Sequence, residues 1–194
     1  MKEKIKLNTK RLVLRDWNRK DMEYLIENLN NINITKWMHI IPNPYTLEDA
    51  KKWMKICEEI EEPRVNYHLA IELKFERHII GGIALTNVDS LDQTATIGYW
   101  LGEKYWNKNY AAEALEEILE FSFNKLNLRR INSSTFVGNV SSRKMLEKYG
   151  FKEEGFRKKI YRCKADNELK DEYIFGLLKE DWLDRIKTKN NENE

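Results

Sequence analysis

Hydrophobic and polar residues alternate along two stretches of the chain, and each stretch runs directly into a segment with helical spacing. The first stretch, Thr94–Leu101, predicts a strand, and a polar loop connects it to a predicted helix over residues 110–126. The second strand is predicted over residues 129–137 and is followed by a helix that opens at Asn139 and stops at Gly150. The two helices therefore begin at the same edge of a sheet. A helix N-terminus with free N–H groups is a site for anions.

The remaining elements follow from the same patterns. Thr46 and Asp49 form a capping box at the start of a helix, and Gly81-Gly82 predicts a bulge in a strand. The element order indicates an α+β (mixed α/β) fold in a single domain, residues 1–186, followed by a polar flexible tail, residues 187–194. The further strands are predicted at residues 11–15, 67–75, 79–86, 156–163 and 172–178, and the further helices at residues 16–30 and 46–61.

Composition narrows the class of protein. A chain of 194 residues with 41% hydrophobic and 34% charged residues fits one soluble globular domain. A net charge of +2 gives no electrostatic argument for nucleic acid or a membrane as partner. The two cysteines and three histidines lack the spacing of a disulfide framework or a metal site. Because no signal segment or long apolar run is present, we expect a cytoplasmic protein without metal.

The loop before the first helix contains residues that suit an anion site. Asn107 and Asn109 tolerate a left-handed backbone, and Lys108 adds a positive charge between them. The backbone amides of residues 107–112 would be free donors. We interpret this turn as a seat for a pyrophosphate. An ordinary polar connection has the same composition, so the loop alone leaves both interpretations open.

The second helix begins with residues that suit the reactive end of a thiol cofactor. Asn139 can cap the helix, and the hydroxyl of Ser142 can reach into a site or bond to the local backbone. In the preceding strand, Gly98 and Gly102 allow a ligand to approach closely. If that strand splays from the next, its free amides can bind an extended ligand such as pantetheine, and an amide near Leu101 can stabilise an oxyanion.

Five segments, taken in order, resemble the GNAT superfamily of acetyltransferases. Within it they are most similar to the group typified by ribosomal-protein alanine N-acetyltransferases and polyamine acetyltransferases. The last of the five is the closest match, and the resemblance covers nearly the whole chain. The segments are Thr9-Lys-Arg-Leu-Val-Leu-Arg15, Pro44-Tyr-Thr-Leu-Glu-Asp-Ala50 followed by Trp53, Ile80-Gly-Gly-Ile83, Ile97-Gly-Tyr-Trp-Leu101, and Asn139-Val-Ser-Ser-Arg-Lys-Met-Leu-Glu-Lys-Tyr-Gly-Phe151.

The resemblance implies a fold and an activity. The fold is a central, mostly antiparallel twisted sheet of about seven strands with a splayed parallel pair, flanked by about four helices. The activity is transfer of an acetyl group from acetyl-CoA to a primary amine by direct attack in a ternary complex. The acceptor is a protein N-terminus or a small amine, and a homodimer is an implied assembly.

The residues expected at the site fall into three groups. Ser142 and Glu103 are the expected catalytic residues, with Ser142 protonating the departing thiolate. The expected acceptor-binding residues are Trp37, Met38, Tyr45 and Asp171. The expected acetyl-CoA contacts are Trp100, Leu101, Gly102, Trp106, Asn107, Lys108, Asn109, Tyr110, Ala111, Ala112, Asn139 and Arg143.

The chain departs from the pattern of these relatives at four positions. Asn107 and Asn109 stand where the first turn normally has glycines, so altered coenzyme binding is one expectation. Thr96 stands where many relatives carry a glutamate, and Leu146 where other branches use a tyrosine. The usual base and a tyrosine acid at that place are therefore both missing.

Several interpretations of the chemistry stay open. Asp89 and Asp92 are base candidates beside Glu103, and a water relay to a distant carboxylate is an equal alternative. A second class of function is a non-catalytic acyl-CoA-binding sensor or partner module of the same fold. A third, a nucleotide-binding αβ domain, is disfavoured because the glycine-rich phosphate loop and the dinucleotide fingerprint are missing.

Overall fold

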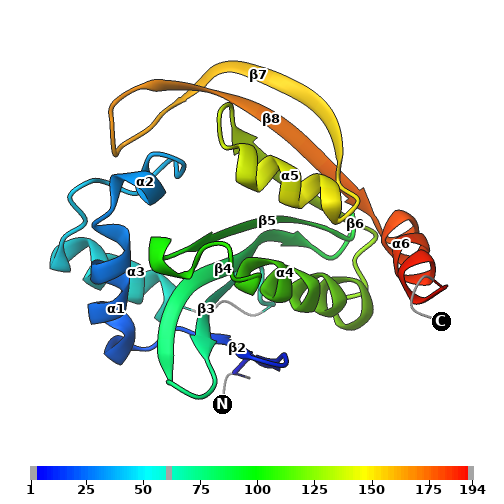
Figure 1. The fold of residues 1–194 in the computed structure, drawn as a ribbon, viewed down its shortest axis with the longest axis horizontal. Coiled ribbons are helices and arrows are strands. Elements are labelled where there is room, and N and C mark those ends of the chain that lie inside the picture. Colours follow the sequence, from blue (N-terminus) through cyan, green and yellow to red (C-terminus); the bar gives the residue numbers. More distant parts are fainter. Residues whose placement is uncertain (1–3, 60–62, 192–194) are drawn as a thin grey trace.

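The computed structural model describes residues 4–59 and 63–191, which form an eight-stranded sheet with helices on both faces (Figure 1). The strand order is β1-β2-β3-β4-β5-β6-β8-β7, and only β5 and β6 pair in parallel. The strands are β1 Lys6–Asn8, β2 Leu12–Asp16, β3 Tyr67–Leu73, β4 His78–Asp89, β5 Thr94–Leu101, β6 Arg130–Phe136, β7 Lys152–Arg162 and β8 Leu169–Leu178.

Six α-helices and three short turns of other helix types connect the strands within the described residues. The α-helices are α1 Met22–Leu29, α2 Ile32–Thr35, α3 Leu47–Glu58, α4 Tyr110–Glu120, α5 Val140–Lys148 and α6 Lys179–Asn191. The short turns are η1 Arg19–Asp21, η2 Glu103–Tyr105 and η3 Phe121–Lys125, the last a π-helical continuation of α4.

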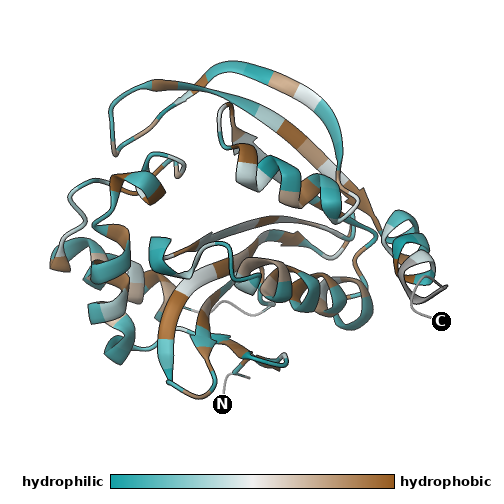
Figure 2. Cartoon of the chain, viewed as in Figure 1, coloured by the Kyte–Doolittle hydropathy of each residue, from teal (hydrophilic) through white to brown (hydrophobic). Residues whose placement is uncertain are grey.

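Alternation along the strands divides the buried residues into two cores, one on each face of the sheet. On β3, Leu69 and Ile71 pack into the core beneath α4 and α5, whereas Ala70 packs into the core beneath α1 and α3. Figure 2 shows hydrophobic residues concentrated along the central strands. The sheet is therefore covered on both faces, which fixes the directions of the side chains described below.

The parallel pair of strands separates part of the way along its length. The register of β5 with β6 runs only from Thr94 opposite Arg130 to Thr96 opposite Asn132, although both strands continue. One residue further, the two strands are still bridged by the Ser133 hydroxyl, which donates to Ile97 O at 3.2 Å. Beyond that point β6 continues with β8, and in Figure 1 the β7–β8 hairpin arches over α5, away from β5. The expected splayed parallel pair is confirmed.

Local sequence signals account for several of the observed boundaries. The Thr46–Asp49 capping box is present, α4 begins at Tyr110 as expected, and Gly150 has a φ of +90° just after α5. The predicted bulge is present where β4 pairs with β3, between Ile71 and Glu72. At these places, capping residues and glycines were therefore sufficient to predict where an element begins, ends or bulges.

Other expectations differ from the structure. The sheet has eight strands instead of about seven, because a hairpin, β1–β2, replaces the first strand. The predicted helix over residues 16–30 begins only at Met22, after a turn that Asn18 caps. Helix α3 ends at Glu58, and residues 60–62 lie outside the described residues. Residues 30–45 were expected to form a loop or a short helix, and they contain the short helix α2. Helix α6 was not expected; it continues through residue 191, and residues 192–194 of the expected tail are not described.

Candidate active site

A cleft of about 530 Å³ lies where β5 leaves β6. It passes through the sheet, because its walls include residues from both faces. Ser142 and Tyr99 lie on the side of α5, whereas Gly98 and Trp100 lie on the side of α1 and α3. Among the residues expected at the site, the lining includes Trp37, Met38, Tyr45, Trp100, Asn139 and Ser142.

Two hydroxyl groups meet on the α5 side of the cleft. The Tyr99 hydroxyl and Ser142 Oγ are 3.1 Å apart, and either atom can be the donor. Burial raises the pKa of Tyr99 to about 12, although its hydrogen bond with Ser142 acts in the opposite direction. Tyr99 therefore keeps its proton at neutral pH. A tyrosine is thus present beside Ser142, from β5 and not from the position of Leu146, which is fully buried in the core.

Backbone groups of β5 face the opening between the strands. The N–H of Gly102 donates to Ile80 O on β4, so the N–H groups of Leu101 and Tyr99, at odd spacing from it, point to the opposite edge. The carbonyls of Ala95 and Ile97 confirm this direction, because Asn132 and Ser133 on β6 donate to them. The expected donor near Leu101 therefore faces the cleft.

The start of α5 is organised by Asn139. Its side chain accepts a hydrogen bond from the backbone N–H of Ser142 at 3.3 Å, which confirms the expected cap. Nearby on β6, the buried hydroxyl of Thr135 also lines the cleft and has no hydrogen-bond partner. An unpartnered buried hydroxyl on a cleft wall is suited to a polar group of a ligand.

The turn before α4 has the backbone that an anion seat requires. Asn107 and Asn109 have φ angles of 58° and 60°, so they adopt the left-handed conformation that the sequence indicated. The first helical hydrogen bond is donated by Glu113 to Asn109 O, which leaves the N–H groups of residues 110–112 without a partner inside the helix. The Asn109 side chain makes no capping bond.

A second, more open groove of about 680 Å³ begins at this turn. Asn109 and Ala112 form one end of it. Lys148 and Arg185 line the same groove, and Arg185 stacks on the Tyr149 ring with its buried Nη1 unpartnered. Arg11 and two carboxylates, Glu113 and Glu116, also line this groove, so it has three cations and two anions. Its cations, beside a helix N-terminus, suit a phosphorylated ligand.

Arg143, expected at the coenzyme, is engaged elsewhere. It forms ion pairs with Glu147 at 2.9 Å and Glu153 at 3.0 Å, and it covers the ring of Tyr173. The reason is its place on α5, which turns it towards the β7–β8 hairpin. Arg185, on the helix that the sequence did not reveal, stands at the groove in its place.

The other expected coenzyme contacts lie in or beside the turn. Gly102 is enclosed, because a Cβ there would stand 1.9 Å from Asn28 Oδ1. Trp106 closes the end of β5 by donating from Nε1 to Leu101 O at 2.9 Å. Lys108 lies over the Tyr105 ring, Tyr110 is covered by Arg11, and Ala111 and Ala112 pack partly against the core.

The structure does not bring the expected base, Glu103, to Ser142. Its carboxylate is exposed on η2 and accepts hydrogen bonds from the side chains of Asn31 and Asn33 at 2.5 and 3.1 Å. These bonds lower the pKa of Glu103, which makes it a weaker base. The alternative bases, Asp89 and Asp92, are also distant from Ser142. Asp89 ends β4 and Asp92 lies in the turn that follows, so both are at the opposite end of β5 from Tyr99.

The carboxylate on the cleft is that of Glu172, not Asp171. Glu172 is 5% exposed and lies 3.6 Å from Arg157 Nη1. It faces the side of α1 and α3, because Phe175, three residues further along β8, faces the other core. Asp171 consequently points to the opposite face of the strand, where it accepts a hydrogen bond from Lys159 N at 2.7 Å.

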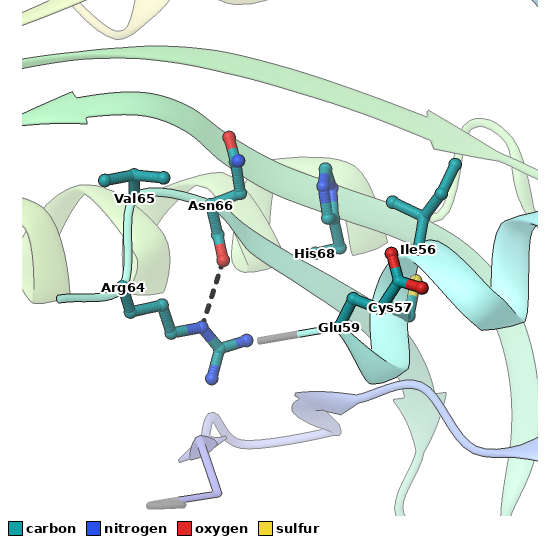
Figure 3. Close-up of a pocket in the computed structure, with 7 residues that line it drawn as sticks. All are labelled: Ile56, Cys57, Glu59, Arg64, Val65, Asn66 and His68. Carbon is teal, nitrogen blue, oxygen red and sulfur yellow. Dashed lines mark hydrogen bonds between the residues drawn. The ribbon is translucent and has the colours of Figure 1, made fainter. Parts of the chain in front are cut away.

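A smaller cavity of about 170 Å³ lies beside the end of α3 (Figure 3). Figure 3 shows Arg64 donating to Asn66 O, with Cys57 on the neighbouring helix. Burial raises the pKa of the Cys57 thiol to about 12, so it is protonated and unreactive at neutral pH. Arg64 is also paired with Asp16 at 2.5 Å. We therefore place the chemistry in the larger cleft.

Sequence reasoning missed three residues of the candidate site: Tyr99, Glu172 and Arg185. The first two were accessible in principle, because alternation along β5 and β8 determines which residues share a face. The third was not, since α6 is polar along most of its length and gives a weak helical signal.

Within residues 4–59 and 63–191, no group of three or more His, Cys, Asp or Glu side chains is arranged to hold a metal ion. In the same part of the chain, no helix is both long enough and apolar enough to cross a membrane.

Comparison with known proteins adds independent findings. The acetyltransferase (GNAT) domain family matches residues 11–152. The uncharacterised N-acetyltransferase YnaD of Bacillus subtilis is 32% identical over 176 residues, which cover 91% of this chain and 98% of YnaD. A solved GNAT-family acetyltransferase from Bacillus anthracis has a TM-score of 0.76 and 28% identity, covering 91% of this chain and 99% of that one. Spermidine N-acetyltransferase from Vibrio cholerae, solved with CoA and spermine, has the same fold, with a TM-score of 0.75 and 21% identity over 89% and 98% of the two chains.

Proposed function

The chain belongs to the GNAT family of N-acetyltransferases, and on that premise we propose that it transfers the acetyl group of acetyl-CoA directly to a primary amine bound in the cleft. The acceptor is a small amine or the N-terminal amine of a protein. The observation that carries the proposal is the opening through the sheet, with the Tyr99–Ser142 pair on one side and the buried Glu172 on the other.

The residues present fit acetyl-CoA, which would supply the acetyl group as an activated thioester. The backbone amides of residues 107–112 and the groove with Lys148 and Arg185 suit its phosphates. The free edge of β5 suits the amide-bearing arm, which binds in the manner of an added strand. Asn109 adopts the same left-handed backbone that a glycine would supply there, so this departure from the family pattern is compatible with binding.

The residues of the cleft have complementary roles in moving protons. An amine is mostly protonated at neutral pH and must lose a proton before it can attack. Glu172 is the carboxylate on the acceptor side, and we assign it the role of holding the ammonium group and taking that proton. Ser142, hydrogen-bonded to Tyr99, gives a proton to the departing CoA thiolate, and Tyr99 supports it because it stays protonated.

The proposal is tested by two measurements on the purified chain. Calorimetric titration with acetyl-CoA is expected to show binding, and a panel of amines is expected to give amine-dependent release of free CoA. A protein that binds acetyl-CoA but releases no CoA with any amine would instead be a non-catalytic acyl-CoA-binding module. Failure to bind acetyl-CoA would contradict both functions.

A further inference from the structure

The acceptor side of the cleft is lined by aromatic groups and has little charge. Glu172 is the only Asp, Glu, Lys or Arg among the described residues that line the cleft. His39 and His68 also line it, and Arg157 is paired with Glu172. A negatively charged acceptor would therefore find no lysine or arginine that is not already beside a carboxylate. Seven aromatic residues from several segments of the chain line this region: Trp17, Trp37, Tyr45, Trp53, Trp100, Phe136 and Tyr161.

Two glycines on this face of the sheet show where space has been left. At Gly82, a Cβ would stand 2.8 Å from Trp100 Nε1 and 3.1 Å from Trp17 Cζ2, so indole rings of the protein already fill that place. At Gly98, on the neighbouring strand, a Cβ would meet no atom within 4 Å apart from its chain neighbours. Gly98 lines the cleft and has no positive φ. Gly98 is exposed, so the space above it is open and accessible to a ligand.

The charge on this side matches a single ammonium group. The Glu172 carboxylate is almost fully buried, and its ion pair with Arg157 is long, at 3.6 Å. A primary ammonium would gain from this carboxylate and from the faces of the surrounding rings. A polyamine carries further ammonium groups. The rings would attract these groups too, but the described lining offers no second carboxylate, so their desolvation would be only partly offset.

We propose that the acceptor is a small arylalkylamine, that is, a primary monoamine with a flat uncharged ring. The ring lies over Gly98 among the tryptophans, and the amine meets Glu172. This proposal rests on the proposed function and narrows it, because it disfavours polyamines and amino acids with a free carboxylate. It also disfavours peptides that begin with a small residue, which bring no ring to the space over Gly98.

The first test compares acceptors that differ in one feature. Phenethylamine is expected to have a kcat/KM at least about tenfold above those of phenylalanine, which adds a carboxylate, and spermidine, which adds charge. Peptides beginning with serine or alanine are expected to fall below it by a similar factor. A preference for spermidine or a peptide would overturn this inference and leave the acetyltransferase proposal intact.

Binding separates the two proposals if no amine is turned over. With CoA present at saturation, phenethylamine is expected to quench tryptophan fluorescence, because its ring enters a pocket of indoles. No turnover together with saturable quenching would overturn the proposed function and retain the arylalkylamine site. No quenching by phenethylamine would overturn the site.

The second test fills the space above Gly98. Gly98→Val adds a β-branched side chain that suits a strand, and it is expected to lower kcat/KM for phenethylamine at least about tenfold with the affinity for CoA unchanged. Methylamine, which needs no ring space, is expected to lose far less. Gly155→Val is the matched control, since a Cβ there meets only Ile174 Cδ1 at 3.6 Å on β7. Equal effects of Gly98→Val on both amines would overturn the proposal.

Discussion

At the scale of single residues, the chemistry depends on side chains that neighbouring strand positions send to opposite faces. Gly98 and Tyr99 are adjacent on β5, yet Gly98 lies on the acceptor side of the cleft, whereas Tyr99 contacts Ser142 of α5 on the other side. Asp171 and Glu172 show the same division on β8. Asp171 therefore provides a matched control, one residue away, for a variant of Glu172.

Ser142→Ala is expected to lower kcat by about 10²-fold, the lower end of the range for a positioned proton donor, with little change in acetyl-CoA affinity. The reason is that its hydroxyl, and not its backbone, faces Tyr99. Ser141→Ala is the control, because Ser141 is exposed on the same turn. Steady-state kinetics and calorimetry check both variants. Unchanged turnover in Ser142→Ala would remove this residue from the reaction.

The pH dependence of kcat tests the role of Tyr99. A proton donor is lost above its pKa, and burial raises the pKa of Tyr99 to about 12. We therefore expect no decline of kcat as the pH rises to 10. Free CoA is measured in samples that are neutralised after the reaction is stopped. A decline in the wild-type protein centred near pH 10 that disappears in Tyr99→Phe would show that Tyr99 titrates normally.

Glu172→Gln keeps the shape of the side chain and removes its charge. We expect kcat/KM for amines to fall by about 10²-fold or more, because the ammonium group loses both its partner and its base. Asp171→Asn is expected to leave kcat/KM within about twofold, since its carboxylate points to the other face of β8. Similar losses in the two variants would contradict the assignment of Glu172.

At the scale of elements, the sequence identified those parts whose signals are local. The β5–loop–α4 and β6–α5 units were placed correctly because alternation, helical spacing and caps all lie within a few residues. Strand β1 and helix α6 were missed because short or mostly polar elements take their stability from packing against distant segments. The carboxylate on the cleft was not predicted for the same reason: Glu103 is near β5 in sequence, whereas Glu172, to which we assign the role of base, comes from another strand.

The turn before α4 provides a prediction at this scale. Asn109 has a φ of 60° and no capping bond from its side chain, so Asn109→Gly is expected to change acetyl-CoA affinity and stability little. Asn109→Val is expected to cost about 1–2 kcal/mol of stability, because a β-branched residue is strained in this conformation. Urea unfolding and calorimetry measure both effects. Tighter coenzyme binding by Asn109→Gly, by tenfold or more, would show that the asparagine side chain obstructs the phosphates.

At the scale of the whole molecule, the eight-stranded sheet divides the reaction between its two faces. The coenzyme's phosphates are assigned to α4 and the groove beside α6, and its reactive end to α5, whereas the acceptor side is enclosed by α1–α3 (Figure 1). The two sides communicate only because β6 leaves β5 after Asn132. In our proposal, the two substrates meet at this single departure from regular pairing.

A crystal structure of the chain with acetyl-CoA tests this central claim most directly. We expect the diphosphate at the backbone amides of residues 107–112 and the thioester in the opening between β5 and β6, with its sulfur beside Ser142. A coenzyme bound outside this opening, or an opening filled by protein side chains when the coenzyme is bound, would contradict the account.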